Sequence, residues 1–174
     1  MFQFSILLFM PFNLQKINML QINQSAPNFT LHSSTRDVNV TLSDLEGKNV
    51  LLLFFPLAFT GVCTKELCSV RDNISFYNNL NATVLGISVD SPATLNKFKE
   101  EQNINFTLLS DFNKEASTAY HCIYDIFFGW MKGVSKRAAF VIDKFGVVQY
   151  AEVLENADEI PNFESIKNIL EKLV

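Results

Sequence analysis

The sequence predicts a single α/β domain with a central mixed β-sheet and helices on both faces of that sheet. Three observations point to it: two continuous apolar runs of strand length, a helical pattern after each of them, and a later pair of strand-like segments joined by a tight turn. The 174 residues fit one domain or one domain plus an appendage. A domain of this length buries roughly two-thirds of its unfolded surface, so it needs no disulfide or metal to fold.

Composition excludes several classes of protein. Hydrophobic residues make up 48% of the chain and charged residues 18%, which excludes an intrinsically disordered chain. The 14 basic and 18 acidic residues give a net charge of −4, and no basic run is longer than Lys136-Arg137, so we expect no nucleic-acid binding. Three scattered cysteines are too few for a disulfide scaffold.

The first residues need a separate interpretation. Residues 1–14 are strongly apolar, but Pro11 interrupts them, and the run is shorter than the ~20 residues that span a bilayer. It contains no basic residue, whereas a secretory signal begins with lysine or arginine. We expect residues 1–20 to be an extension of unclear role; an internal start at Met19, a targeting or anchoring segment and a structural element stay open. The domain would span residues 21–174, away from membranes, in the cytoplasm or, as the weaker alternative, in an organelle.

The first elements are two short strands near residues 29–31 and 39–41, which we expect to form an N-terminal β-hairpin extension. Residues 49–55 are a continuous apolar run, typical of a strand that is covered on both faces, and Pro56 ends it. A helical pattern opens at Thr60, with apolar side chains spaced by three and four residues at Leu67, Val70, Ile74 and Tyr77.

The second strand and helix repeat this order. Residues 83–89 are expected to form a second buried strand, and Asp90-Ser91-Pro92 then offers a cap with proline in the first turn of a helix that reaches about Gln102. A short strand over residues 106–109 and a brief helix over residues 113–121 follow.

The chain ends in a strand pair and a helix. Residues 137–143 and 147–153 have strand patterns, and Lys144-Phe145-Gly146 between them is a hairpin turn signal. The last helix is expected over about residues 158–173. The complete order, β-α-β-α-β-(α)-β-β-α, is a thioredoxin-like arrangement.

The junction of the first long strand with its helix carries the chemistry. Cys63 falls in the first turn of that helix, where unpaired N–H groups and the helix dipole favour a thiolate. Glu66, one turn later, opposes this effect somewhat. The alternative is that Cys63 is an inert buried thiol.

Three residues around this junction carry a specific pattern. Pro56, Thr60 and Cys63 form P-x-x-x-T-x-x-C, the active-site signature of peroxiredoxins, the AhpC/TSA family. The stretch FFPLAFTGVC, which ends at Cys63, resembles the AhpE-like branch of that family. A second cysteine five residues later, Cys68, resembles the bacterioferritin-comigratory-protein/PrxQ branch.

A distant segment supports the same resemblance. Residues 135–143, SKRAAFVID, resemble the family's strand that bears an arginine, which is Arg137 here. The similarity then covers roughly residues 19–174 with the same order of elements.

The resemblance implies a thiol-dependent peroxidase that reduces hydrogen peroxide and organic hydroperoxides without a cofactor or metal. The Cys63 thiolate would attack one peroxide oxygen and become a sulfenic acid. Thr60 would accept a hydrogen bond from the peroxide and donate one to the thiolate, while the N–H groups of Val62 and Cys63 would stabilise the transition state. Arg137 would stabilise the thiolate and the leaving oxygen, and Pro56 would shield the sulfur and limit over-oxidation.

Cys68 decides how the sulfenic acid is resolved. In an intact helix two residues five apart have Cα atoms about 8.6 Å apart, whereas a disulfide tolerates no more than about 7 Å. A Cys63–Cys68 disulfide therefore requires the first turns of the helix to unwind, as PrxQ-type enzymes are understood to do. The alternative is that Cys68 packs as a small hydrophobe and an external thiol completes the reaction. The implied reductant is thioredoxin or a glutaredoxin-like protein, and the implied oligomeric state is a monomer or homodimer.

The other cysteine and the histidines have simpler interpretations. We expect Cys122 to be a core thiol, with an alternative resolving or intermolecular cysteine as the second reading. His32 is expected to be a surface or strand histidine. We expect no zinc site, because the paired short spacings of structural zinc are absent among Cys63, Cys68, His121 and Cys122.

An aromatic group precedes the strand that bears the arginine. It comprises Phe127, Phe128 and Trp130, and we expect it to make core or dimer contacts rather than to form a substrate wall.

Two other functions of the same fold require different cysteine spacings. A thiol–disulfide oxidoreductase would have Cys-x-x-Cys after the strand, whereas four residues separate Cys63 from Cys68. A copper-binding assembly protein would have Cys-x-x-x-Cys and a distant histidine, and only the histidine, as His121, has a counterpart.

Overall fold

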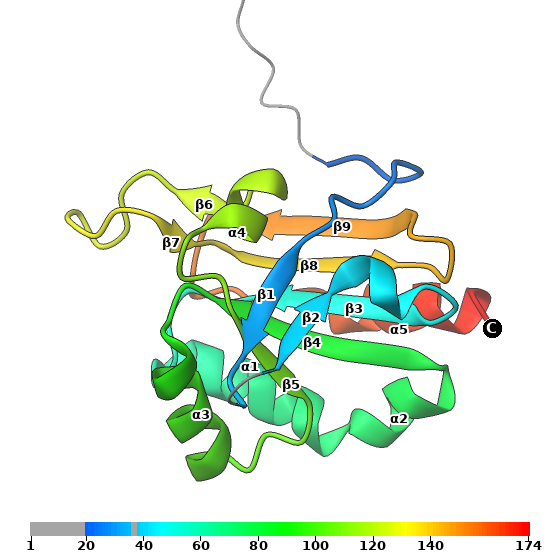
Figure 1. Ribbon diagram of the computed structural model, residues 1–174, viewed down its shortest axis with the longest axis horizontal. Coiled ribbons are helices and arrows are strands. Elements are labelled where there is room, and N and C mark those ends of the chain that lie inside the picture. Colours follow the sequence, from blue (N-terminus) through cyan, green and yellow to red (C-terminus); the bar gives the residue numbers. More distant parts are fainter. Residues whose placement is uncertain (1–19, 36–37) are drawn as a thin grey trace, which may run out of the picture.

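A seven-stranded mixed sheet forms the centre of the structure, a computed structural model that describes residues 20–35 and 38–174 (Figure 1). The strand order is β2-β1-β5-β4-β3-β8-β9, in which β3, β4 and β5 run parallel and the other neighbours pair antiparallel. The strands are β1 (Thr30–Ser33), β2 (Asn39–Thr41), β3 (Asn49–Phe54), β4 (Ala82–Ser88), β5 (Thr107–Ser110), β8 (Arg137–Ile142) and β9 (Val148–Leu154). The predicted fold class, a central mixed sheet flanked by helices, is confirmed.

Helices cover both faces of the sheet, but unequally. One face packs against α1 (Gly61–Asp72), α2 (Ile74–Asn79), α3 (Pro92–Glu101) and α5 (Phe163–Lys172). The opposite face packs against α4 (Glu115–Ala119) and the 3-10 helix η1 (Leu42–Leu45). Within residues 20–35 and 38–174, no helix has both the length and the apolar character that crossing a bilayer requires.

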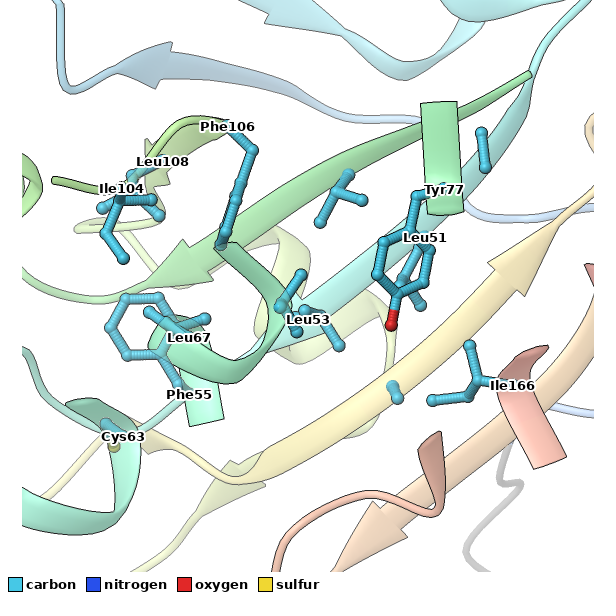
Figure 2. Close-up of a cluster of buried hydrophobic side chains, with 14 of the residues drawn as sticks. Leu51, Leu53, Phe55, Cys63, Leu67, Tyr77, Ile104, Phe106, Leu108 and Ile166 are labelled. Carbon is cyan, nitrogen blue, oxygen red and sulfur yellow. The ribbon is translucent and has the colours of Figure 1, made fainter. Parts of the chain in front are cut away.

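The central strand β3 is buried over its whole length. Because side chains alternate along a strand, Leu51 and Leu53 join the core on the side of α1, while Leu52 and Phe54 join the core on the side of α4. Figure 2 shows Leu51 and Leu53 in the first of these cores, together with Leu67 from α1. The apolar run in the sequence is therefore a strand covered on both faces, as predicted.

The helix expected from Thr60 through Tyr77 is two helices, α1 and α2, separated by Asn73. The Asn73 side chain donates from Nδ2 to the backbone oxygen of Ser69, 2.8 Å away. An asparagine that bonds to nearby backbone in this way competes with continuation of the helix. The apolar spacing continues across the break, so Tyr77 of α2 is buried in the same core as α1.

The last helix begins at Phe163 rather than near residue 158. Pro161 disfavours helical backbone at the residue before it. Asn162 then caps the helix, because its side chain accepts a hydrogen bond of 2.9 Å from the backbone N–H of Ser165.

A small hairpin was not predicted from the sequence. Its strands, β6 (Ile123–Tyr124) and β7 (Val134–Ser135), pair antiparallel and have two residues each, which is too short for a periodic pattern. We call residues 123–135 the β6–β7 arm. In Figure 1 the arm projects from the body of the domain.

The predicted N-terminal hairpin of β1 and β2 is an edge of the main sheet, because β1 also pairs antiparallel with β5. Ahead of it, Ser25 forms a bridge with Val147, so the chain joins the domain soon after residue 20. The predicted extension over residues 1–20, with its alternative start at Met19, lies outside the described residues except for its last position.

Candidate active site

The site lies where β3 ends and the chain turns into α1, at the carboxyl edge of the parallel strands. Phe59, which precedes the N-cap residue of α1, has a φ of +63°, a strained conformation for a bulky side chain. Asp90, just after β4, holds this turn: its Oδ2 accepts hydrogen bonds from the Ala58 N–H at 2.7 Å and from the Ser88 hydroxyl at 2.8 Å. The sequence predicts Asp90 only as part of a helix cap. Its position after a parallel strand was the signal for this second role.

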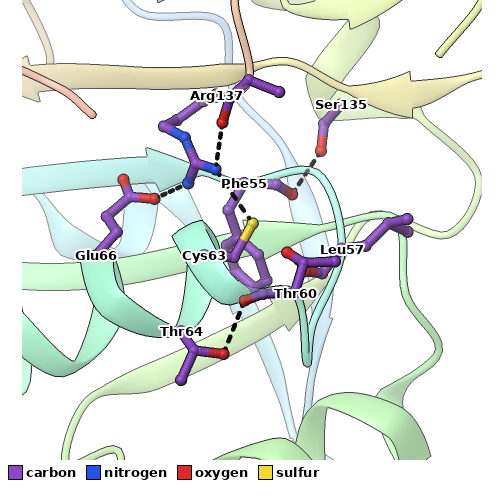
Figure 3. A network of polar contacts seen from close by, with 9 residues as sticks. Phe55, Leu57, Thr60, Cys63, Thr64, Glu66, Ser135 and Arg137 are labelled. Atoms are coloured by element: carbon purple, nitrogen blue, oxygen red, sulfur yellow. Dashed lines mark hydrogen bonds and ion pairs between the residues drawn. The ribbon is translucent and has the colours of Figure 1, made fainter. Parts of the chain in front are cut away.

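Cys63 and Arg137 meet at the centre of the site (Figure 3). Cys63 lies in the first turn of α1, and Arg137 is the first residue of β8. Since β8 pairs Ala138 with Phe54 at the end of β3, Arg137 lies level with the turn that follows. Its Nη2 is 3.3 Å from the Cys63 sulfur, and both side chains are 1% exposed.

The Arg137 guanidinium is held by two further contacts. Nη1 donates to Glu66 Oε2, and Nη2 also donates to the backbone oxygen of Ala157, 2.9 Å away. Burial alone would lower the pKa of Arg137, but the negative charges of Glu66 and Cys63 outweigh it and raise the pKa. Arg137 therefore supplies a permanent positive charge directly at the sulfur.

Glu66 reaches this cluster because it lies one turn after Cys63 on the same face of α1. Its side chain is fully buried. Burial raises the pKa of Glu66 from 4.5 to about 7, and the charge of Arg137 opposes that rise. Its carboxyl group binds the arginine that faces the sulfur, so Glu66 contacts the sulfur through Arg137, and its opposition to the thiolate stays a prediction.

The raised pKa of Glu66 predicts a pH dependence of stability. Between pH 4.5 and about 7 the folded protein holds a proton on Glu66 that the unfolded chain has released, so the free energy of unfolding should fall as the pH rises through this window. The full change corresponds to roughly 3 kcal/mol. Glu66→Gln should lack this component in urea unfolding curves recorded from pH 4.5 to 8. A constant stability difference between wild type and variant over that range would contradict the prediction.

Thr60 is the N-cap residue of α1, but its side chain makes no capping bond. Its Oγ1 donates to the backbone oxygen of Leu57, 2.9 Å away, and not to the Cys63 sulfur as we expected. The oxygen keeps its lone pairs, so it can accept a hydrogen bond from a bound molecule. The N–H groups of Val62 and Cys63 belong to the first turn of the helix, where N–H groups have no partner within the helix.

A pocket of about 210 Å³ opens above these groups. It is lined by Pro56, Thr60, Gly61, Val62, Cys63, Phe127, Phe128, Arg137, Ala157 and Asp158. All the predicted site residues except Glu66 and Cys68 therefore face one cavity, and Glu66 contacts it through Arg137.

The aromatic group needs a partial correction. Phe127 and Phe128 line the pocket together with residues at the start of α1, whereas the sequence predicts core or dimer contacts for them. Trp130 of the same arm does not line the pocket and is 74% exposed. Strands of two residues leave no periodic pattern in a sequence, so the arm and its wall could not be predicted.

Cys68 lies on the same continuous helix as Cys63, and both thiols are free. Cys68 is half-buried at the edge of the core, with its sulfur 3.8 Å from Gln102 Oε1 at the end of α3. Helical geometry directs two side chains five positions apart away from each other. This arrangement is the one expected of the reduced protein.

Cys122 packs in the core on the opposite face of the sheet from Cys63. It is completely buried, and burial raises the pKa of its thiol. The prediction of a core thiol is confirmed. His32 lies exposed on β1, as expected. In the part of the chain that the structure describes, no group of three His, Cys, Asp or Glu residues could hold a metal ion.

Comparison with known proteins gives one consistent result. The model of the AhpC/TSA family matches residues 22–151. Alkyl hydroperoxide reductase E from Mycobacterium tuberculosis is 39% identical over 138 residues, covering 78% of this chain and 86% of that protein. A peroxiredoxin named bcp from Coxiella burnetii is 39% identical over 131 residues, covering 74% of this chain and 85% of that protein. The solved structure of peroxidoxin BcpB from Mycobacterium tuberculosis superposes with a TM-score of 0.77 at 27% identity, covering 89% of this chain and 99% of that one.

Proposed function

Because the chain belongs to the AhpC/TSA family and is a thiol-dependent peroxidase with the thioredoxin-like fold of that family, we propose that Cys63 is its peroxidatic residue. The observation that carries the proposal is the contact between the Cys63 sulfur and Arg137 Nη2 at the base of an open pocket. A thiol that is buried beside a permanent cation and also reaches a cavity is suited to attack a small electrophile. The resemblance seen in the sequence is thereby confirmed at the level of the family.

The geometry supports the following reaction. The Cys63 thiolate attacks the nearer peroxide oxygen, the S–O bond forms as the O–O bond breaks, and the leaving hydroxide or alkoxide takes up a proton. Thr60 Oγ1 would accept from the peroxide hydroxyl and so orient it. The N–H groups of Val62 and Cys63 and the guanidinium of Arg137 would stabilise the charge that moves to the leaving oxygen. Pro56, buried at the wall of the pocket, would limit the access of further peroxide to the sulfenic acid.

Peroxides are the oxidising substrates of this enzyme, and a thiol is its reductant. We propose hydrogen peroxide and organic hydroperoxides as the peroxides and thioredoxin or a glutaredoxin-like protein as the reductant, acting on a monomer or homodimer. The proposed domain is residues 21–174, with residues 1–20 as an extension and no cofactor. We propose the cytoplasm as the compartment, with an organelle as the alternative.

We propose that Cys68 resolves the sulfenic acid. Cys68 is half-buried at the edge of the core, so unwinding the first turns of α1 would release it together with Cys63, at the cost of exposing the buried Leu67 between them. Attack of its thiolate on the Cys63 sulfur forms the disulfide and releases water, with the departing hydroxide taking up a proton. The competing proposal is resolution by an external thiol.

Cys68→Ser separates the two proposals. Wild type treated with one equivalent of peroxide should become two hydrogens lighter, with a 63–68 link in its peptide map and faster amide exchange around residues 62–72. Cys68→Ser should still consume one equivalent, because attack needs only Cys63, but it should stall with thioredoxin and over-oxidise at higher peroxide. Cys122→Ala, which removes a core thiol on the opposite face, is the control and should behave as wild type.

Two results would contradict resolution by Cys68. A stable sulfenic acid in oxidised wild type, with no 63–68 link, would favour an external thiol. A link from Cys63 to Cys122 would instead require the segment after α4 to move.

A further inference from the structure

The turn between β3 and α1, residues 56–60, holds two of the residues that line the pocket, Pro56 and Thr60. The turn itself belongs to no helix or strand of the described chain. Its internal hydrogen bond, from Thr60 Oγ1 to the backbone oxygen of Leu57, spans only three residues. Phe59 has a positive φ, which a bulky residue keeps only when its surroundings impose it. The shape of the turn therefore depends on contacts from other parts of the domain.

Asp90 supplies the polar contact to this turn. Its Oδ2 accepts a hydrogen bond of 2.7 Å from the backbone N–H of Ala58, a residue 32 positions away in the chain. Hydrogen bonds to a carboxylate are stronger than those between neutral groups. Ala58 is buried, so water competes little for this N–H group. The bond fixes the backbone two residues before Thr60.

Asp90 is in turn fixed by the ends of two neighbouring strands. The Ser88 hydroxyl of β4 donates to the same Oδ2 at 2.8 Å, and the Asp90 N–H donates back to Ser88 Oγ at 3.2 Å. The Ser110 hydroxyl, at the end of β5, donates to the backbone oxygen of Asp90 at 2.6 Å. The carboxylate is therefore pre-organised by the sheet to receive the N–H group of the turn.

An aromatic contact from the next helix acts on the adjacent residue of the turn. The Phe59 ring packs edge-on against the Phe98 ring of α3, with centroids 5.1 Å apart. That helix begins at Pro92, two residues after Asp90. Two successive residues directly before Thr60 are thus held by the segment that follows β4.

The sulfur and its cation are held by other contacts. Cys63 lies inside α1 and packs in the core of the domain. Arg137 is bound by Glu66 and by the backbone oxygen of Ala157. In the part of the chain that the structure describes, Asp90 does not line the pocket, so it can act on a bound peroxide only through the turn. The structure thus separates the groups that hold the thiolate from those that hold Thr60.

We propose that Asp90 is a positioning residue of the peroxide reaction, because it holds Thr60 where the Thr60 oxygen and the Cys63 sulfur reach the same peroxide molecule. This inference rests on the proposed roles of Cys63 and Thr60. The chemistry is unchanged: the S–O bond forms as the O–O bond breaks, and the leaving oxygen takes up a proton. A misplacement of about 1 Å can cost roughly 100-fold in rate. Loss of Asp90 should therefore slow the reaction with peroxide and spare the reactivity of the thiolate itself.

Asp90→Ala tests this through two reactions of one sulfur, in a Cys68→Ser/Cys122→Ala background that leaves Cys63 as the remaining cysteine of the chain. The second-order rate constant for hydrogen peroxide, measured by stopped flow, should fall by about 10- to 100-fold. The rate constant for alkylation by iodoacetamide should stay within about twofold, because alkylation needs the thiolate but not Thr60. The pH profile of alkylation should not shift. A general loss of structure would change both reactions.

Three further variants sharpen the comparison. Asp90→Asn keeps an oxygen that can accept from the Ala58 N–H and should restore the peroxide rate constant to within a few-fold of the background. Ser88→Ala removes the hydroxyl that fixes the carboxylate and should show the same selective loss to a smaller extent, which keeps the proposal testable if Asp90→Ala does not fold. Asp44→Ala, on η1 at the opposite face of the sheet, is the control and should leave both rate constants unchanged.

Three outcomes would overturn the inference. Equal losses with peroxide and iodoacetamide in Asp90→Ala and Ser88→Ala would make Asp90 a structural residue. An unchanged peroxide rate in Asp90→Ala would show that Thr60 keeps its position without it. A loss in Asp90→Asn as large as in Asp90→Ala would assign the effect to the negative charge rather than to the bond with Ala58. These results are distinct from a failure of the proposed function, which would appear as peroxidase activity retained in Cys63→Ser.

Discussion

Replacing Cys63 with serine is expected to reduce peroxide consumption to the rate of the buffer alone. A serine hydroxyl stays protonated at neutral pH, so the residue no longer presents an anionic nucleophile to the peroxide. Serine is close to cysteine in size and can still accept a hydrogen bond from Arg137, so the fold should be retained. The measurement is hydrogen peroxide consumption by protein treated with a chelator, with dithiothreitol as the reductant.

Cys122→Ala is the matched control for this experiment. Cys122 is a buried thiol on the opposite face of the sheet, so its removal should leave peroxide consumption at the wild-type rate. Thermal unfolding of both variants separates a loss of chemistry from a loss of structure. Turnover retained in Cys63→Ser would assign the attack to another thiol. Wild-type activity that disappears with the chelator would instead favour metal chemistry.

The elements that the sequence predicted well are those with strong local patterns. Strand β3 is apolar at every position after Asn49 because both faces of the central strand are covered. The start of α3 could be predicted from the sequence, because Ser91 caps this helix and Pro92 occupies its first turn. The break between α1 and α2 had no such signal, because it depends on which partner the Asn73 side chain binds.

The features of the active site also differ in how well the sequence predicted them. A linear motif predicted Pro56, Thr60 and Cys63, and a second motif predicted Arg137. The hydrogen bond between Glu66 and Arg137 joins positions far apart in the chain, and it depends on the register of β8 against β3. No local pattern specifies that register.

The aromatic wall of the pocket was the feature that the sequence predicted least well. The arm that carries Phe127 and Phe128 has strands of two residues, held by bonds to distant backbone. Its aromatic residues read in the sequence as ordinary core positions. Only the folded structure shows that they line a cavity.

Arg137→Met is expected to slow the oxidation of Cys63 by about 10²–10³-fold, the usual effect of losing one donor that stabilises charge in the transition state. The Arg137 Nη2 group is 3.3 Å from the sulfur, so we expect its charge to act on the thiolate and, in the proposed reaction, on the leaving oxygen. Stopped-flow measurement of the second-order rate constant with hydrogen peroxide tests this. Lys136→Met is the control, because Lys136 is the adjacent residue and forms its ion pair with exposed Glu155 outside the site.

Glu66, the buried partner of Arg137, means that Arg137→Met could change stability as well as the rate. Loss of the guanidinium would leave the buried Glu66 carboxyl without its hydrogen-bond partner, and a buried polar group left unpaired costs about 1–3 kcal/mol of stability. The double variant Glu66→Gln/Arg137→Met removes both charges and should recover most of that stability while the rate stays low. A slow rate in a stable double variant assigns the effect to the missing charge at the sulfur. A rate within a few-fold of wild type would show that Arg137 only binds Glu66 and that other groups stabilise the leaving oxygen.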